Sequence, residues 1–388
     1  MTTGSFLTPT GLTVHAAPSI FANIGETKDI TDVVTGWGHT VNAIGGYKSA
    51  TANLGVSLAD LDEWLDTGLG RDITLHTADL NIRFNGFVNN LIATIGGLNI
   101  TIGPLMQIAN RAKCVYSTVD TSISPPAVGV RAVTSLYNST ASQAIYCTLA
   151  KVLSIGGSTL ANAQQIAQSY IAEYDIPQVS QSLSLGGGGG ISLKLDCLGY
   201  GAFLETYPYI NTSSGTTTIS ARLPLILAAN PSGIYSTDYS EIASNTTTIP
   251  IYENNDRTAW TQIASLIDKG DASFNRYIFG IYAARRAFYN AVPSAIEYYH
   301  QVTSEYPEVT DVQNARVNAW DILPGKWLQV NDILVGRVNP SSLSADPRNI
   351  FIESVSYTAP YGLSITGGKV SRLAQYLGRL GLAGVSAK

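Results

Sequence analysis

The sequence predicts an α+β protein that is mainly β: two β-barrel units with short flanking helices and a mixed middle insertion. Short runs of alternating apolar and polar residues recur between turn residues along most of the chain, which is typical of strands. Helical spacing is confined to a few segments. A helix that ends at a glycine and is followed by hairpin-like strands occurs twice, at 57–88 and at 257–302. The repeat suggests an internal duplication, although residue identity between the copies is slight.

The first unit is expected over residues 1–118. Tyr47–Leu54 reads as a strand, and Ser57 begins a helix as its N-cap, with Asp60 at the third helical position and Gly68 at its end. A further strand is expected at 72–77, where Ile73, Leu75 and Thr77 alternate with Asp72, Thr74 and His76 as in a half-buried strand. The remaining expected elements are strands at 82–88, 97–102 and 114–116, with one or two helical turns at 104–113.

The middle segment, 119–180, is expected to be a linker followed by a helical insertion. Residues 119–136 have a linker composition with Ser124–Pro126 at the centre. Apolar residues at helical spacing from Thr159 to Tyr174 predict the clearest helix of the chain, and Asp175–Pro177 ends it.

The second unit is expected over 181–360, with a C-terminal docking tail at 361–388. A strand is predicted at 191–198, short strands and long polar loops at 207–250, and a helix at 257–270. Further strands are predicted at 275–282, 286–292, 295–302 and 349–357, and a strand–turn–strand at 320–335. Leu373–Leu382 has apolar residues at helical spacing but also two glycines, which is more typical of a docking segment than of a membrane anchor.

Composition limits the function classes. Charged residues make up 13% of the 388 residues, against about 25% in an average soluble domain. The net charge of −5 is unlike that of a duplex-binding domain, which is normally basic. Tyr, at 21 residues, is abundant, and interface centres are poor in charge and rich in Tyr. The composition therefore favours an assembled structural subunit over a free monomer.

No catalytic, metal or cofactor residues are assigned. The four histidines, His15, His39, His76 and His300, are scattered, without zinc-site spacing, and His76 is expected on a strand surface. The acids Asp60, Asp62, Glu63 and Asp66 lack the pattern of a calcium loop, so a helix cap and a solvated face explain them better. Cys114, Cys147 and Cys197 form no CxxC pair and are expected to be reduced thiols.

Two other motifs have a simple structural interpretation. Gly186–Gly190 precedes a strand, whereas a phosphate-binding loop precedes a helix, so the run is expected at a hairpin end or a close backbone approach. Arg285 and Arg286 lie among Tyr282, Phe288 and Tyr289, as in a patch that binds single-stranded nucleic acid. Neighbouring strand residues point to opposite faces, which favours a solvent or interface role for these arginines. The N-terminus shows no signal-peptide pattern.

Several runs resemble hub and distal tail proteins of tailed bacteriophages. In the first half these are Gly46–Thr51, Leu65–Leu75 and Phe84–Val88. In the second half they are Trp260, Gly270–Asp271, Arg276–Arg285, Tyr298, Trp320–Gly325 and Asp332. Residues 119–180 and the glycine run have no counterpart in the resemblance, which leaves the particular tail component open.

The resemblance implies a virion structural subunit at the distal end of the tail tube, made in the host cytoplasm. Such hubs are typically trimers in which each subunit contributes two tube-like β-barrel domains to a pseudo-sixfold ring. The implied partners are copies of the chain in a ring, with a trimer favoured over a hexamer, the tail tube protein, other tail tip proteins and the tape measure protein. No specific nucleic-acid binding, cofactor or membrane anchor is implied, and an acidic wall would let DNA pass without holding it.

Two other functions stay open at this point. A receptor- or carbohydrate-binding tail tip protein would use Tyr and Trp to stack on sugars. A glycan hydrolase would need two carboxylates about 5–9 Å apart across a cleft, and the 28 acidic residues of the chain offer many such pairs.

Overall fold

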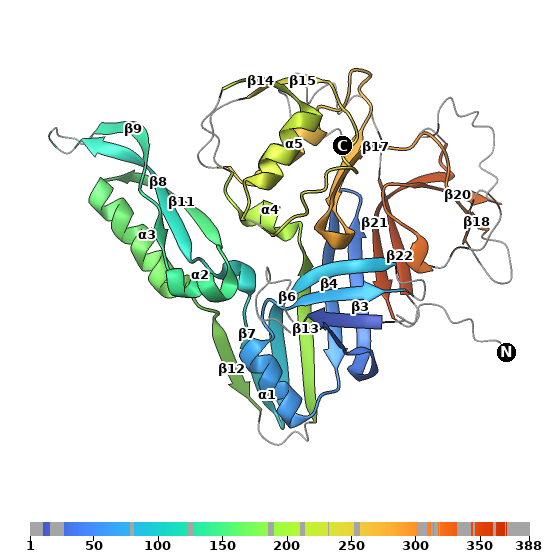
Figure 1. Cartoon of the computed structure of the whole chain (residues 1–388), viewed down its shortest axis with the longest axis horizontal. Helices are drawn as coiled ribbons and strands as arrows, with labels where there is room; N and C mark the ends of the chain where they lie inside the picture. Colours follow the sequence, from blue (N-terminus) through green and yellow to red (C-terminus); the bar gives the residue numbers. More distant parts are fainter. Residues whose placement is uncertain are drawn as a thin grey trace.

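The computed structural model describes residues 11–15, 27–77, 81–120, 122, 127–184, 190–209, 214–231, 233–251, 257–301, 309–311, 313, 317, 319–331, 343, 346–359, 362–368 and 370. Most of the regular structure is strand, which confirms the prediction of a mainly β, α+β fold. A body built on one large sheet carries an arm that projects from one side (Figure 1). The predicted helix in Leu373–Leu382 and the residues 186–189 of the glycine run lie outside the described residues.

The large sheet has 16 strands and draws on both halves of the chain. Its first-half strands are β1 (Gly11–His15), β2 (Thr27–Asp29), β3 (Val34–Asn42), β4 (Gly45–Leu54), β5 (Asp72–His76), β6 (Ile82–Ile95) and β7 (Leu98–Ile102). Its later strands are β12 (Val179–Leu183), β13 (Ile191–Gly199), β16 (Tyr277–Ile281), β17 (Ala287–Ala291), β18 (Tyr298–Gln301), β19 (Val309–Asp311), β20 (Trp327–Asn331), β21 (Asn349–Thr358) and β22 (Gly362–Gly368). The main path runs β19–β18–β20–β21–β3–β4–β13–β6–β5–β1–β2.

Strand β13 lies in the middle of this path, antiparallel to both of its neighbours. It pairs with β4 from Leu193↔Leu54 to Leu198↔Ser49 and with β6 from Ile191↔Ile95 to Gly199↔Gly86. Sheet pairing therefore crosses the boundary predicted between the 1–118 and 181–360 units, and the division into two barrel domains stays a prediction.

Gly46 allows strand β16, from the second half of the chain, to pair with β4 of the large sheet. Strand β16 runs parallel to β4, with Gly280 opposite Gly45 and Ile281 opposite Gly46. The backbone of Gly46 has φ +80°, and a Cβ at this position would lie 2.2 Å from the carbonyl oxygen of Ile281. Any larger residue would force β4 and β16 apart, so this contact requires glycine.

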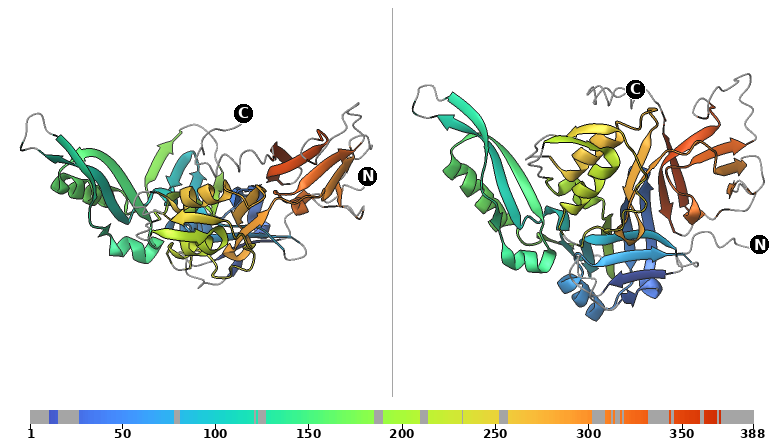
Figure 2. Two further views of the ribbon diagram at one scale, coloured as in Figure 1. Left: turned by 90° about the horizontal axis from the view of Figure 1, so that it is seen from above. Right: turned by 45° about the horizontal axis from the view of Figure 1, so that its top comes forward.

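The arm is a small second sheet covered by a helix (Figures 1 and 2). It contains β8 (Arg111–Asp120), β9 (Ala127–Val133), β10 (Tyr137–Asn138), β11 (Ala150–Ser158), α2 (Thr140–Tyr146) and α3 (Leu160–Tyr174). Ala163 and Ala167 of α3 pack on Cys114 and Tyr116 of β8 in a core of their own. The chain enters the arm after β7 and leaves it into β12, and these two strands pair with each other.

Two sequence predictions about loops were wrong. Residues 119–136 are not a linker, because 127–133 form β9, which pairs with β8, and the prolines 125–126 come immediately before that strand. Residues 207–250 contain the helix α5 (Ile219–Ala228) between β14 (Gly215–Thr218) and β15 (Thr248–Ile251). Leu223, Ile226 and Leu227 are buried in the main core, which outweighs the low helix propensity of Pro224.

The predicted strand around Trp320 was also wrong. Residues 319–321 form the 3₁₀ turn η4 (Ala319–Asp321), and the strand after the Pro–Gly turn is β20. The turn seats the Trp320 ring against the rings of both His39 and Tyr357, each at a centroid distance of 5.2 Å, and the His39 and Tyr357 rings contact each other at 4.5 Å. Packing between β3, β21 and this turn therefore replaces strand pairing at Trp320.

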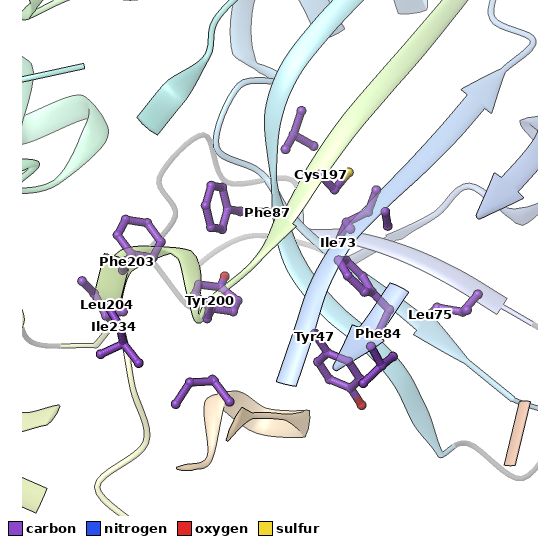
Figure 3. Close-up of a cluster of buried hydrophobic side chains, with 14 of the residues drawn as sticks. Tyr47, Ile73, Leu75, Phe84, Phe87, Cys197, Tyr200, Phe203, Leu204 and Ile234 are labelled. Atoms are coloured by element: carbon purple, nitrogen blue, oxygen red, sulfur yellow. The ribbon is translucent and has the colours of Figure 1, made fainter. Parts of the chain in front are cut away.

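The predicted helices were confirmed as α1 (Leu58–Thr67), α3 and α6 (Ala259–Ile267). In α1 the Asp60 amide donates to the Ser57 hydroxyl oxygen at 3.2 Å, and that hydroxyl donates to the Asp60 carboxylate at 2.6 Å. A short helix that was not predicted, α4 (Ala202–Thr206), adds Phe203 and Leu204 to the core around Tyr200 and Phe87 (Figure 3).

Replacing Trp64 with alanine should test the seating of α1. Trp64 is 4% exposed and lies beneath the Arg71 guanidinium at 4.9 Å. We expect Trp64→Ala to lower the free energy of unfolding by about 3–5 kcal/mol because it leaves a cavity. Denaturant melts will measure the loss, with Leu58→Ala as the control, since Leu58 on the same helix is 53% exposed. A loss below about 1 kcal/mol for Trp64→Ala would contradict this placement.

Candidate functional site

The structure does not bring the four histidines together as a site. His39 is buried, and its Nδ1 accepts a hydrogen bond from the Trp37 indole at 2.9 Å. Burial lowers the pKa of His39 to about 3, so its ring is neutral. His76 contacts the Thr74 hydroxyl at 3.2 Å, His300 lies on β18, and His15 is on β1 with a side chain outside the description. Within the described ranges no cluster of His, Cys, Asp or Glu side chains has the make-up of a metal site.

The acidic residues of α1 have the structural roles that the sequence favoured. Asp60 belongs to the helix cap, and Glu63 pairs with the buried Arg71 at 3.2 Å. Asp62 and Asp66 are exposed. All three cysteines are free, with Cys114 and Cys197 buried.

Arg285 and Arg286 have different environments. Arg286 is half-exposed and pairs with Asp238 at 3.3 Å and Glu241 at 3.5 Å. Arg285 is largely buried: its guanidinium lies 4.4 Å from the centre of the Tyr200 ring and forms an ion pair with Asp72. The guanidinium also donates to the Gly233 carbonyl at 2.8 Å. Arg285 is therefore a link between the two halves of the chain rather than a solvent arginine.

This link forms one wall of an open pocket of about 530 Å³. Strands β5 and β6 contribute Asp72, Thr74, Ile82 and Asn85 to the pocket. The 233–237 segment and the turn at 284–285 form the opposite side of the pocket. They supply Gly233, Tyr235, Ser236, Thr237, Ala284 and Arg285. The pocket is the candidate binding site because its lining combines hydroxyl, amide and charged groups with the apolar side chains of Ile82 and Ala284 and the Tyr235 ring.

The Asp72 carboxylate is an unusual group in this pocket wall. Its side chain is 5% exposed, Oδ2 faces Arg285, and Oδ1 is buried with no hydrogen-bond partner. Burial raises the pKa of Asp72 to about 6, although the positive charge of Arg285 acts in the opposite direction. The sequence predicted the Asp72 and Thr74 face of β5 to be the polar, outer face of a half-buried strand. That prediction was wrong, because the 233–237 segment and the 284–285 turn cover this face.

The turn that presents Arg285 is strained. Ala284 has φ 56° and ψ 25°, and Arg285 has φ 60°, so two consecutive non-glycine residues are left-handed. Each costs roughly 1–2 kcal/mol relative to an ordinary conformation. The Ser236 amide holds the turn by donating to the Arg285 carbonyl at 3.0 Å. Such strain is concentrated at functional sites.

A second feature is an uncovered apolar surface on the arm. Val128 and Val130 of β9 are 70% and 77% exposed, and Val133 is also exposed. On β12, beside the base of the arm, Val179 and Leu183 are 58% and 62% exposed. We call these five residues the arm surface. Strand β9 pairs with β8 on one side, and no partner on its other side occurs among the residues that the structure describes.

Comparisons with known proteins give only distant similarity. No family model and no curated protein matches the chain. The chain is similar to a solved tail protein from Neisseria meningitidis MC58, with 8% identity, TM-score 0.40 and coverage of 90% of this chain and 91% of that chain. It is also similar to the 43 kDa tail protein of prophage MuSo2 from Shewanella oneidensis, with 8% identity, TM-score 0.42 and coverage of 94% of this chain and 97% of that chain. A third similar structure is prophage tail protein gp18 from Listeria monocytogenes EGD-e, with 9% identity, TM-score 0.36 and coverage of 96% of this chain and 99% of that chain.

None of the described helices has the length and apolarity needed to cross a membrane.

The raised pKa of Asp72 predicts a pH-dependent contribution to stability. Because the folded-state pKa, about 6, lies above the unfolded value near 3.8, protonation of Asp72 favours the folded state as the pH falls from 7 to 5. Asp72→Asn removes that titration, so the stability deficit of the variant should be larger at pH 5 than at pH 7 by about 1 kcal/mol. Urea unfolding of both proteins at the two pH values measures it. A deficit that shrinks toward pH 5 would mean that the folded-state pKa is depressed instead.

The left-handed turn predicts a stabilising substitution. Ala284 is exposed, so Ala284→Gly removes little packing and relieves the strain of its positive φ. We expect a gain of about 0.5–1 kcal/mol in the free energy of unfolding. The control is Ala172→Gly on the exposed face of α3, which should lose about 0.5–1 kcal/mol. Equal losses for the two variants in thermal melts would argue against the turn geometry.

Proposed function

We propose that the chain is a structural subunit of a bacteriophage tail that closes side by side with copies of itself into a ring at the distal end of the tail tube. It would join tube to tail tip and let DNA pass. The proposal combines the sequence resemblance to hub and distal tail proteins with the physical character of the surface. A trimer is favoured over a hexamer, and the tail tube, tail tip and tape measure proteins are the proposed neighbours.

The arm surface is the observation that supports assembly most directly. Soluble monomers normally protect a free strand edge with charged residues, prolines or a covering segment. In β9 the single charged residue is Arg131, and the large side chains Val128 and Val130 are mostly exposed. The arm projects from the body (Figure 2), so we expect a neighbouring copy to contact it without a rearrangement of the large sheet.

The low charge of the chain supports the same proposal. A copy of this chain is a suitable partner for the arm surface because charged residues make up only 13% of the sequence, so association would bury few charges. The arm surface has one part on β9 and one on β12, and contacts between unlike parts of neighbouring copies would be head-to-tail contacts, which close into rings when the rotation permits.

We propose no enzymatic activity. Glycan hydrolysis by the usual mechanism needs a pair of carboxyl groups across a cleft. Among the described residues that line the pocket, Asp72 is the one carboxylate, and Arg285 is bonded to it. The arrangement is therefore better suited to binding than to bond cleavage.

Assembly can be tested by placing a charge on the arm surface. Val130→Lys should weaken self-association about tenfold or more, because a lysine at the interface must be desolvated, while the melting temperature of the monomer stays unchanged. Mass photometry across a dilution series measures the populations of single chains and of rings. Leu225→Lys is the matched control, since Leu225 on α5 is 55% exposed and lies outside the arm surface.

The proposal fails if the wild-type chain stays a single molecule at every concentration, or if Val130→Lys assembles as well as Leu225→Lys does. A receptor-binding tail tip protein, the alternative function, would instead occupy a peripheral position in labelled virions.

A further inference from the structure

We infer that the pocket between β5, β6, the 233–237 segment and the 284–285 turn binds a small, neutral, polyhydroxylated molecule of the sugar class. This inference goes beyond the proposed ring assembly and does not depend on it. The pocket volume of about 530 Å³ lies within the range of about 300–1,000 Å³ that is usual for small-molecule sites.

The uncharged polar groups of the lining determine the ligand class. Thr74, Asn85, Ser236 and Thr237 supply hydroxyl and amide groups that can both donate and accept hydrogen bonds. They come from two strands of the large sheet and from a segment more than a hundred residues later, so the fold itself brings them together. Groups that both donate and accept hydrogen bonds match the hydroxyl groups of a sugar, and Ile82 offers an apolar contact for its C–H groups.

The charges in the wall argue against an ionic ligand. Arg285 is already engaged by the Asp72 carboxylate, the Gly233 carbonyl and the face of the Tyr200 ring. An anion would have to compete with Asp72 for this guanidinium, and a cation would meet Arg285 beside the carboxylate. Because the pair neutralises itself, the remaining groups favour an uncharged ligand.

Two costly features lie at this same pocket. Asp72 Oδ1 is a buried polar atom without a hydrogen-bond partner, and such atoms are rare in folded proteins. Ala284 and Arg285 hold consecutive left-handed conformations in the opposite wall. The 233–237 segment and the Arg285 carbonyl are tied together by the Ser236 amide, so the strained turn fixes the position of the Ser236 and Thr237 hydroxyls.

Binding can be measured with defined sugars. The probes are the methyl glycosides of glucose, galactose, mannose, N-acetylglucosamine and rhamnose, studied by saturation-transfer NMR and by titration against the full chain. Sodium sulfate serves as the anionic probe. We expect at least one glycoside to bind with a millimolar or tighter dissociation constant, and sulfate not to displace it.

Substitutions then place the binding in this pocket. Thr237 is an exposed lining residue, so Thr237→Trp should fill the pocket without disturbing the core and weaken binding at least tenfold. The matched control is Thr216→Trp, at an exposed position on β14, which should bind as the wild type does. Thr74→Val, which removes a hydroxyl at nearly constant shape, should weaken binding and lower the melting temperature slightly, because that hydroxyl also contacts His76 at 3.2 Å.

The inference is overturned if none of the five glycosides binds, if sulfate displaces the bound glycoside, or if Thr237→Trp binds as tightly as Thr216→Trp. Assembly of the same variants, followed by mass photometry, should be unchanged because the pocket residues lie outside the arm surface. Loss of sugar binding and loss of ring formation are therefore separate results.

Discussion

The position of β13 between β4 and β6 is the constraint on which the rest of the body depends. Both of its edges are paired, and Leu193, Leu195 and Cys197 are buried in the main core. A Cβ on Gly199 would lie 1.9 Å from the Tyr47 carbonyl oxygen, so even the end of this strand has room for glycine alone. The hairpin β3–β4 on one side and the β5–β6 pair on the other are held in one sheet by this single strand.

Side-chain contacts then tie the second half to the sheet at two further places. The stacked rings of His39, Tyr357 and Trp320 join β3 to β21 and to the turn at 319–321. The Asp72–Arg285 pair joins β5 to the turn at 283–285, and the candidate pocket lies beside it. The first contact is between uncharged aromatic rings and stabilises mainly by burial, whereas the second includes a buried charge whose desolvation offsets much of the attraction. The ion pair therefore determines geometry more than it adds stability.

Sequence patterns predicted the helices and strands whose formation depends on residues close together in the chain. Three elements were predicted correctly because the pattern that predicts each lies within the element itself. These patterns are the cap at Ser57, the helical spacing in Thr159–Tyr174 and the alternation in Ile191–Leu198. Burial of Asp72 could not be predicted, because the segments that cover it come from residues 233–237 and 284–285. Strand β9 could not be predicted either, because its partner β8 lies on the other side of the prolines that resembled a linker. The pairing of β13 across the predicted domain boundary also depends on distant residues. The candidate site was missed for this reason: its residues meet only through long-range contacts.

The attachment of the arm has an evolutionary consequence. The chain leaves the body after β7 and returns in β12, its paired neighbour, and the Gly103 amide donates to the Gln178 carbonyl at 3.0 Å, so departure and return lie side by side. A segment inserted between adjacent ends can be exchanged, shortened or replaced as a cassette while the host sheet keeps its pairing. A change in the length or sequence of the arm therefore needs no compensating change in the 16-stranded sheet that carries it.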